Sequence, residues 1–322
     1  MQPDRQSSEA LPNANRGVGD GSVLSKQQVE FYHEEGYIVV EDVLDKALLT
    51  KLREVTDEVT ASAADLTESN DIIDLEPGHS GENPAIRRIK RPHLAHEFYL
   101  ELCAATCITD LLVPLIGPDI RLRAGGKVNM KSAGFGAPVE WHQDWAFYPH
   151  TNDDVLAVGI PLDDMDSNNG PLLVLPGTHK GPVYDHHSQG AFCGAIDPTT
   201  VDIDFSKVVA LTGKAGSMTI HHARLIHGSE LNRSDRQRRL LLYEYTAADA
   251  WPMAGVEPLS DFDEFNKRVV RGSPTIEPRV EPVPIRMPFP KAPYQGSIYE
   301  NQRSLSHNYF DHSPEAKRAE AT

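Results

Sequence analysis

Residues 139–150, VEWHQDWAFYPH, hold a histidine and an aspartate two positions apart, His142 and Asp144. We expect a β-strand over 139–148, in which alternate side chains point to one face, so these two would share a face. One imidazole nitrogen and one carboxylate oxygen are two of the three protein ligands in the 2-His-1-carboxylate sites of non-haem iron(II) oxygenases. Alone, the pair is a weak signal, because a histidine or an aspartate beside a turn is usually a surface residue.

A candidate third ligand lies on a later segment, LIHGS at 225–229, which contains His227. Gly228, the next residue, leaves room for close approach of a ligand or of another backbone segment. Beyond a turn at 232–235, we expect a hairpin that brings the following strand back antiparallel beside the strand of His227.

That following strand begins with two arginines, Arg238 and Arg239, before three leucines. Arg238 has the parity of Leu240 and Leu242, so one of the two arginines must face the interior. An interior guanidinium needs a carboxylate partner, which a dicarboxylate cosubstrate would supply through a bidentate ion pair. The alternative, in which both arginines lie on the rim, stays open at this point.

The segment around these residues has the pattern of a mainly β fold. Short runs of alternating or continuous apolar residues are separated by Gly, Pro, Asn and Asp turns, with no helical pattern between them. Short strands in this order favour an antiparallel sandwich or jelly roll over a βαβ fold. The expected strands are 120–130, 139–148, 155–162, 171–175, 208–211, 217–222 and 239–246.

Helices are expected before this core, at about 25–117. Ser25 and Gln28 form a capping-box pattern, and Asp45 precedes a helix with one apolar face. Residues 65–92 have the composition of a polar loop that ends in a basic cluster, either solvated or beside an anionic ligand. That cluster consists of Arg87, Arg88, Lys90 and Arg91.

The expected organisation is a single domain at 25–300 between two flexible tails, 1–24 and 301–322. The jelly-roll core would cover about 120–247, and a proline-rich segment at about 251–300 would wrap it as extended chain.

Charge and cysteine content limit the possible partners and compartment. The chain has 322 residues, with 31 Lys and Arg against 47 Asp and Glu and a formal net charge of -16. This balance argues against nucleic acid or an anionic membrane as a partner, and leaves a small molecule as the expected one. Three cysteines are too few for a disulfide framework, and the sequence has no signal-peptide pattern, so we expect a cytoplasmic protein. The sequence does not indicate an oligomeric state.

Three segments together resemble the phytanoyl-CoA dioxygenase family of iron(II)- and 2-oxoglutarate-dependent oxygenases. They are HQDWAFYPH at 142–150, NNGPLLVLPGTHKG at 168–181 and LIHGSELNRSDRQRR at 225–239, and the resemblance covers roughly residues 27–247. It implies a double-stranded β-helix, a jelly roll of the cupin type, with flanking N-terminal helices.

The resemblance also implies roles for particular residues. His142, Asp144 and His227 would bind Fe(II), and Arg238 and Ser229 would bind the distal carboxylate of 2-oxoglutarate. Asn129 matches a residue that contacts the cosubstrate in some relatives, and no catalytic residue is expected beyond the iron ligands.

Several neighbours are candidates for the pocket wall. Lys127 and Lys131 share the parity of Asn129. Strict alternation would place His221 on the face of His227, whereas the resemblance places His222 near the pocket. A wall or core role is expected of these two histidines.

The implied reaction is hydroxylation of an unactivated C–H bond of a small organic substrate. It would consume O2 and 2-oxoglutarate and release succinate and CO2. Two alternatives from other classes stay open: a non-oxidative cupin-type metal enzyme and a non-catalytic jelly-roll binding protein.

Overall fold

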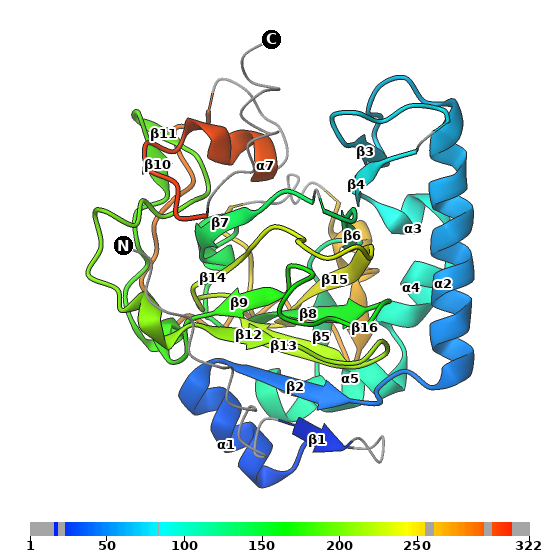
Figure 1. The fold of residues 1–322 in the computed structure, drawn as a ribbon. Helices are drawn as coiled ribbons and strands as arrows, with labels where there is room; N and C mark the ends of the chain where they lie inside the picture. Colours follow the sequence, from blue (N-terminus) through cyan, green and yellow to red (C-terminus); the bar gives the residue numbers. More distant parts are fainter. Residues whose placement is uncertain are drawn as a thin grey trace.

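The computed structural model describes residues 16–18, 23–82, 84–134, 136–254, 261–292 and 298–310. Its centre consists of two β-sheets, one of ten strands and one of four, with helices around the larger sheet (Figure 1). The larger sheet runs in the order β1-β2-β13-β8-β15-β6-β4-β3, with β5 attached to β15 and β16 attached to β5. The smaller sheet has the order β12-β9-β14-β7. The expected mainly β jelly roll is therefore confirmed.

The larger sheet contains β1 (Arg16–Val18), β2 (Tyr37–Glu41), β3 (Ile73–Leu75), β4 (Ile86–Ile89), β5 (Ile120–Leu122), β6 (Lys127–Lys131), β8 (Val155–Pro161), β13 (Met218–His222), β15 (Arg238–Ala247) and β16 (Val269–Arg271). The smaller sheet contains β7 (Val139–His142), β9 (Leu172–Val174), β12 (Val209–Leu211) and β14 (His227–Ser229). A separate hairpin pairs β10 (His187–Ser188) with β11 (Ala191–Phe192). The helices are α1 (Lys26–Glu35), α2 (Lys46–Ala61), α3 (Pro92–Ala95), α4 (Phe98–Cys103), α5 (Thr106–Ile116), α6 (Phe262–Asn266) and α7 (Ile298–Asn301).

The two faces of the larger sheet have different partners, and β15 illustrates the division. Its odd-numbered residues Leu241, Tyr243 and Tyr245 are fully buried in the main apolar cluster, which includes side chains of α1, α2, α4 and α5. Its even-numbered residues from Arg238 to Glu244 line a cavity on the opposite face. The alternation of side chains along a strand thus separates a hydrophobic core from a polar site.

The expected starts of the first two helices are confirmed. The Ser25 side chain accepts a hydrogen bond from the backbone of Gln28, whose side chain accepts one from the backbone of Ser25. Asp45 caps α2 by accepting a hydrogen bond from the backbone N–H of Leu48.

Two expectations about strands were wrong. The hairpin expected after His227 does not form, because β14 pairs with β7 and β9 in the smaller sheet while β15 pairs with β5, β6 and β8 in the larger one. The polar stretch 65–92 is not all loop, since it contains the antiparallel pair β3 and β4. Both strands are short, and β4 carries its basic residues inside the strand, which hides the apolar alternation.

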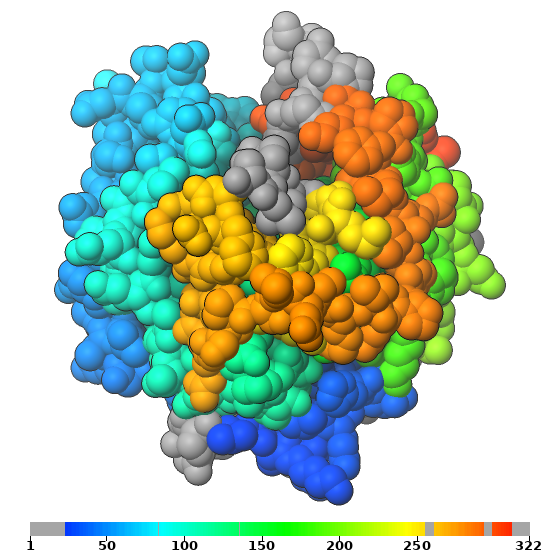
Figure 2. Space-filling model, turned by 180° about the vertical axis from the view of Figure 1, so that it is seen from behind, coloured from blue at the N-terminus to red at the C-terminus, as the bar shows by residue number. Residues whose placement is uncertain are grey.

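The chain after β16 lies across the surface (Figure 2, orange) and contains no helix or strand over 272–290. Main-chain atoms of this segment accept hydrogen bonds from the Trp145 indole and from the backbone of Phe192. The chain then returns to the smaller sheet: Phe310 is 5% exposed and packs on Trp141. Residues 301–310, expected in the C-terminal tail, are thus packed in the structure, because Phe310 and its neighbours bury apolar surface.

The remainder of that expected tail, 311–322, lies outside the described residues, as does most of the expected N-terminal one. Residues 16–18 of the latter form β1, which pairs in parallel with β2. Within the described ranges, no helix is long and apolar enough to cross a membrane.

Candidate active site

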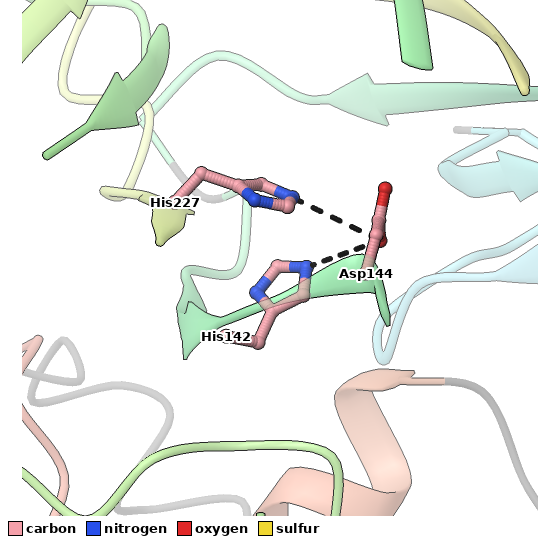
Figure 3. Close-up of side chains that lie close together, drawn as sticks. All are labelled: His142, Asp144 and His227. Carbon is pink, nitrogen blue, oxygen red and sulfur yellow. Dashed lines mark ion pairs between the residues drawn. The ribbon is translucent and has the colours of Figure 1, made fainter. Parts of the chain in front are cut away.

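Three side chains from the smaller sheet converge on one point. His142 ends β7 and His227 begins β14, and the two are register partners in neighbouring strands. Asp144 lies two residues after β7, at the start of a 3-10 turn. The Nε2 atoms of His142 and His227 lie 3.7 and 3.9 Å from Oδ1 of Asp144 (Figure 3). Among the described residues this is the one group of His, Cys, Asp or Glu side chains placed to hold a metal ion, with its ligand atoms within 4.8 Å of one another.

Asp144 lies outside a strand, whereas we expected one strand over 139–148. The strand ends at His142, but Gln143 keeps an extended backbone with φ -118° and ψ 125°, so the alternation of side chains persists to Asp144. The Gln143 side chain points away and is fully buried. It donates to the carbonyls of Pro182 and Arg224 and accepts from the backbone of Tyr184, which fixes the bend.

The hydrogen bonds of the two histidines leave the correct nitrogen for a metal. Nδ1 of His142 donates to the carbonyl of Glu140 at 2.8 Å, and Nδ1 of His227 donates to the carbonyl of Leu225 at 3.0 Å. A carbonyl can only accept, so each Nδ1 carries the proton and each Nε2 keeps its lone pair toward Asp144.

The surroundings of these three side chains keep them in the protonation states that bind metals. Desolvation lowers the pKa of His142, and it lowers the pKa of His227 well below the usual value, so both rings are neutral. Burial by itself would raise the pKa of Asp144. The neighbouring side chains of His221, His227 and Lys127 nevertheless hold that pKa well below its usual range. Two neutral imidazoles beside a carboxylate suit a divalent cation.

A cavity of about 390 Å³ lies between the two sheets, and all three of these side chains line it. Arg238 reaches it from the larger sheet and is 2% exposed. Its Nη2 donates to the carbonyl of Gly170 at 2.5 Å, while Nε and Nη1 are buried without a hydrogen-bond partner among the described residues. Burial lowers the pKa of Arg238 to about 10, so the guanidinium remains charged at neutral pH. A buried guanidinium with unused donors and no carboxylate partner fits an acidic ligand.

Of the two adjacent arginines, Arg238 is therefore the one that faces the interior. Arg239 points to the other face, where its Nε and Nη2 donate to the carboxylate of Asp163 at 3.0 and 2.8 Å. Its Nη1 donates to Asp57.

The other expected cosubstrate residues lie near Arg238. Ser229 lines the cavity, and its hydroxyl donates to the same Gly170 carbonyl at 3.3 Å while accepting from Nζ of Lys131 at 2.5 Å. Asn129 lies in β6, opposite Leu240 of β15, and also lines the cavity. Its Oδ1 is buried without a partner among the described residues. The structure therefore gathers all six expected site residues around one cavity.

The cavity wall contains residues that the sequence did not single out. Arg123, Glu244 and Tyr299 belong to it. Glu244 has the parity of Arg238, which is a usable signal, whereas Tyr299 comes from the distant α7 and has none.

Of the two adjacent histidines, His221 lines the cavity and His222 does not, so alternation along β13 was right and the placement of His222 by resemblance was wrong. Nε2 of His221 lies 3.8 Å from Oδ2 of Asp144.

Comparisons with known proteins agree with this site. A family model described as phytanoyl-CoA dioxygenase (PhyH) matches residues 32–240. The chain is 38% identical over 292 residues to a probable alpha-ketoglutarate-dependent hypophosphite dioxygenase from Stutzerimonas stutzeri, covering 89% of this chain and 100% of that protein. It is 29% identical over 247 residues to L-proline trans-4-hydroxylase from Streptomyces griseoviridis, covering 70% of this chain and 88% of that protein. Among solved structures, EctD from S. alaskensis with bound Fe superposes with a TM-score of 0.60 at 24% identity, covering 84% of this chain and 94% of that one.

Two facing sheets, a buried His-Asp-His group and a buried arginine at one cavity define a non-haem iron oxygenase of the double-stranded β-helix class. The chain belongs to the phytanoyl-CoA dioxygenase family. It is an iron(II)- and 2-oxoglutarate-dependent dioxygenase that acts on a small molecule, and the expected C–H hydroxylation fits that family. The two alternative classes, a non-oxidative metal enzyme and a binding protein, are accordingly set aside.

Proposed function

We propose that His142, Asp144 and His227 bind the iron, and that Arg238 and Ser229 hold the distal carboxylate of 2-oxoglutarate. Nε2 of each histidine and the Asp144 carboxylate would take three positions on one side of the metal, which leaves the cavity side for ligands. Arg238 offers two buried donors without a partner among the described residues, and Ser229 adds a hydroxyl. The buried Oδ1 of Asn129 would accept from a protonated neighbour or an ordered water beside the cosubstrate.

The chain's own residues contribute positioning and exclusion of water. Iron(II), when bound with 2-oxoglutarate, supplies the activation of O2. Arg238 fixes the cosubstrate end, and the two histidines keep their lone pairs aligned through their carbonyl hydrogen bonds. Phe147, Leu240 and Leu242 line the same cavity and keep water away from the reacting atoms.

The prime substrate in this proposal is a small anion with a P–H bond, hypophosphite. The observation that carries it is the cavity itself: about 390 Å³, near the lower limit of ligand pockets, must hold both cosubstrate and substrate. Its wall includes five Lys or Arg side chains against two carboxylates, in a chain whose overall balance is acidic. A small anion fits this space and charge, and the relative of 38% identity is named a hypophosphite dioxygenase.

The proposed reaction balances as an ordinary dioxygenation. One oxygen atom of O2 enters a P–H bond of hypophosphite, which gives phosphite. The other oxygen enters 2-oxoglutarate, whose carboxylate carbon leaves as CO2 while succinate forms.

The test is an assay of the purified enzyme with Fe(II), 2-oxoglutarate and hypophosphite under O2, followed by phosphorus NMR. We expect phosphite and succinate in equal amounts, incorporation of label from ¹⁸O2 into phosphite, and no product with His227→Ala. Succinate formation without phosphite, in enzyme that binds iron and 2-oxoglutarate, would refute the substrate. A panel of small carboxylates would then test the expected C–H hydroxylation.

A cytoplasmic location and the absence of nucleic-acid and membrane partners remain predictions from composition and charge.

A further inference from the structure

The cavity has a second cationic end, opposite the one with Arg238. On β15 the cavity-facing residues run from Arg238 through Leu240 and Leu242 to Glu244, a span of about 20 Å at the usual rise per residue. On β6, Lys131 pairs in register with Arg238, and Lys127 pairs with Leu242. Lys127 and Glu244 therefore lie at the end of the cavity away from the proposed cosubstrate site.

Glu244 is shared by two cations at this end. Its Oε2 accepts from Nε of Arg123 at 2.9 Å and from Nη2 of the same residue, and its Oε1 accepts from Nζ of Lys127 at 3.1 Å. Glu244 is 5% exposed, and burial would raise its pKa. Arg123 and Lys127 lower that pKa below the usual value, so the carboxylate is ionised. Two cationic side chains thus share one buried carboxylate at this end.

The other cations of the cavity wall have partners elsewhere. Arg88 is paired with Asp74 at 2.7 Å, and Lys131 donates to Ser229 and to the Glu230 carbonyl near Arg238. The end of the cavity with Lys127 is therefore suited to a second anion, in a buried space where Coulomb interactions are strong.

The position of Lys127 also suits contact with a molecule beside the metal. Lys127 lines the same cavity as His142 and Asp144. Its side chain is 32% exposed, and Glu244 takes one of the three N–H donors of the ammonium. Arg123 is held more firmly, since its guanidinium also stacks 3.9 Å above the ring of Tyr148.

The open side of this end faces a second hollow. Arg123, Phe147 and Asn301 line both the cavity and a larger hollow of about 1460 Å³. The cluster of Arg123, Lys127 and Glu244 therefore borders that hollow through Arg123.

We propose that Lys127, positioned by Glu244 and Arg123, binds the negatively charged oxygens of the prime substrate and places its reacting bond at the iron. This inference rests on the proposed function in taking a small anion as substrate. It adds the residue that selects for that anion.

The experiment compares Lys127→Gln with Lys127→Arg and with a matched control, Lys90→Gln. Lys90 is an apt control because it also donates to a buried carboxylate shared with an arginine, Asp74, at 3.0 Å and with 28% side-chain exposure. It lines the larger hollow but not the cavity. Hypophosphite and formate are titrated anaerobically into enzyme loaded with Fe(II) and 2-oxoglutarate, and the visible charge-transfer band reports binding. Product formation is measured separately.

We expect Lys127→Gln to raise the half-saturating hypophosphite concentration by about 10- to 100-fold, the effect of losing one charged hydrogen bond. Lys127→Arg should recover part of the loss, and Lys90→Gln should stay within about twofold of wild type on the same scale. The affinity for 2-oxoglutarate should be unchanged in all three, which also shows that the variants are folded.

The outcomes separate the two proposals. Wild-type binding and wild-type KM for hypophosphite in Lys127→Gln would overturn the role of Lys127 and leave the proposed function intact. Anion binding that depends on Lys127 without any phosphite formation would overturn hypophosphite as substrate and support the anion site. A wild-type band that responds to neither anion would overturn the anion site as well.

Discussion

Replacing Arg238 with methionine should weaken 2-oxoglutarate binding while leaving the cosubstrate-free protein at least as stable as wild type. Arg238 is 2% exposed and has one hydrogen bond, from Nη2 to the Gly170 carbonyl, while Nε and Nη1 are buried without partners among the described residues. A residue that serves the fold would have its donors satisfied within the protein. The burial of a charge with two idle donors is therefore a cost that a ligand must offset.

The magnitudes follow from these contacts. Each of the two buried unsatisfied donors costs roughly 1–3 kcal/mol, and the bond to Gly170 returns about 1 kcal/mol, so removing the guanidinium should stabilise the cosubstrate-free protein by about 1–5 kcal/mol. Loss of one partner from a buried ion pair costs about 3–5 kcal/mol. The dissociation constant of 2-oxoglutarate should therefore rise by about two to three and a half orders of magnitude.

The assay measures thermal unfolding with and without 2-oxoglutarate, together with an anaerobic Fe(II) titration of the charge-transfer band. Arg239→Met is the matched control, because Arg239 is the adjacent residue and makes its ion pairs to Asp163 and Asp57 on the other face. The control should lower the stability by about 1–3 kcal/mol and keep the affinity for 2-oxoglutarate. If Arg238→Met instead lost stability like the control and kept its cosubstrate affinity, the reasoning would be refuted.

Three other substitutions test separate parts of the structure. Gly170→Ala should weaken 2-oxoglutarate binding, because Gly170 has φ +71° and a Cβ there would lie 2.7 Å from the Glu230 carbonyl oxygen and 2.9 Å from Lys131; an unchanged dissociation constant would contradict this. Glu76→Gln should flatten the pH dependence of stability. Burial raises the pKa of Glu76 from 4.5 to about 7, although Arg87 and Lys131 act in the opposite direction. The folded state then binds the extra proton, so the free energy of unfolding of wild type falls by up to about 3 kcal/mol as pH rises from 4.5 to 7. Parallel pH profiles for wild type and variant would argue against this origin. Phe310→Ala should cost about 3 kcal/mol in denaturant unfolding, because the ring is buried on Trp141, and a cost near zero would mean that the C-terminal segment does not stabilise the fold.

The parts of the site that the sequence predicts depend on local patterns. The family resemblance assigned Asn129 and Arg238 to one site, and both line the cavity because alternation along β6 and β15 brings them to one face. The same rule chose His221 over His222. The spacing of the proposed ligands His142 and Asp144 is a usable signal because it survives the bend after His142.

The errors concern which strands become neighbours. A hairpin after His227 is the shortest connection, but the chain crosses instead from the smaller sheet to the larger one, where β15 finds a partner on each side in β6 and β8. Pairing of this kind is decided by burial of whole faces, which no short segment reveals. Likewise Tyr299 and Phe310 reach the cavity wall and the smaller sheet through contacts with residues more than 100 positions away, beyond any periodic signal.

The division of the site between two sheets gives a physical role to the turn Asn168-Asn169-Gly170. The proposed metal ligands lie on or directly after strands of the smaller sheet, and Arg238 lies on the larger one, so the distance between the proposed metal and cosubstrate sites depends on how the sheets are held together. Gly170 ends that turn, and its carbonyl accepts from Ser229 on β14 and from Arg238 on β15. One backbone oxygen thus joins both sheets at the cosubstrate end. Because the Arg238 bond exists before 2-oxoglutarate arrives and holds the guanidinium in place, the site gains affinity from being preorganised.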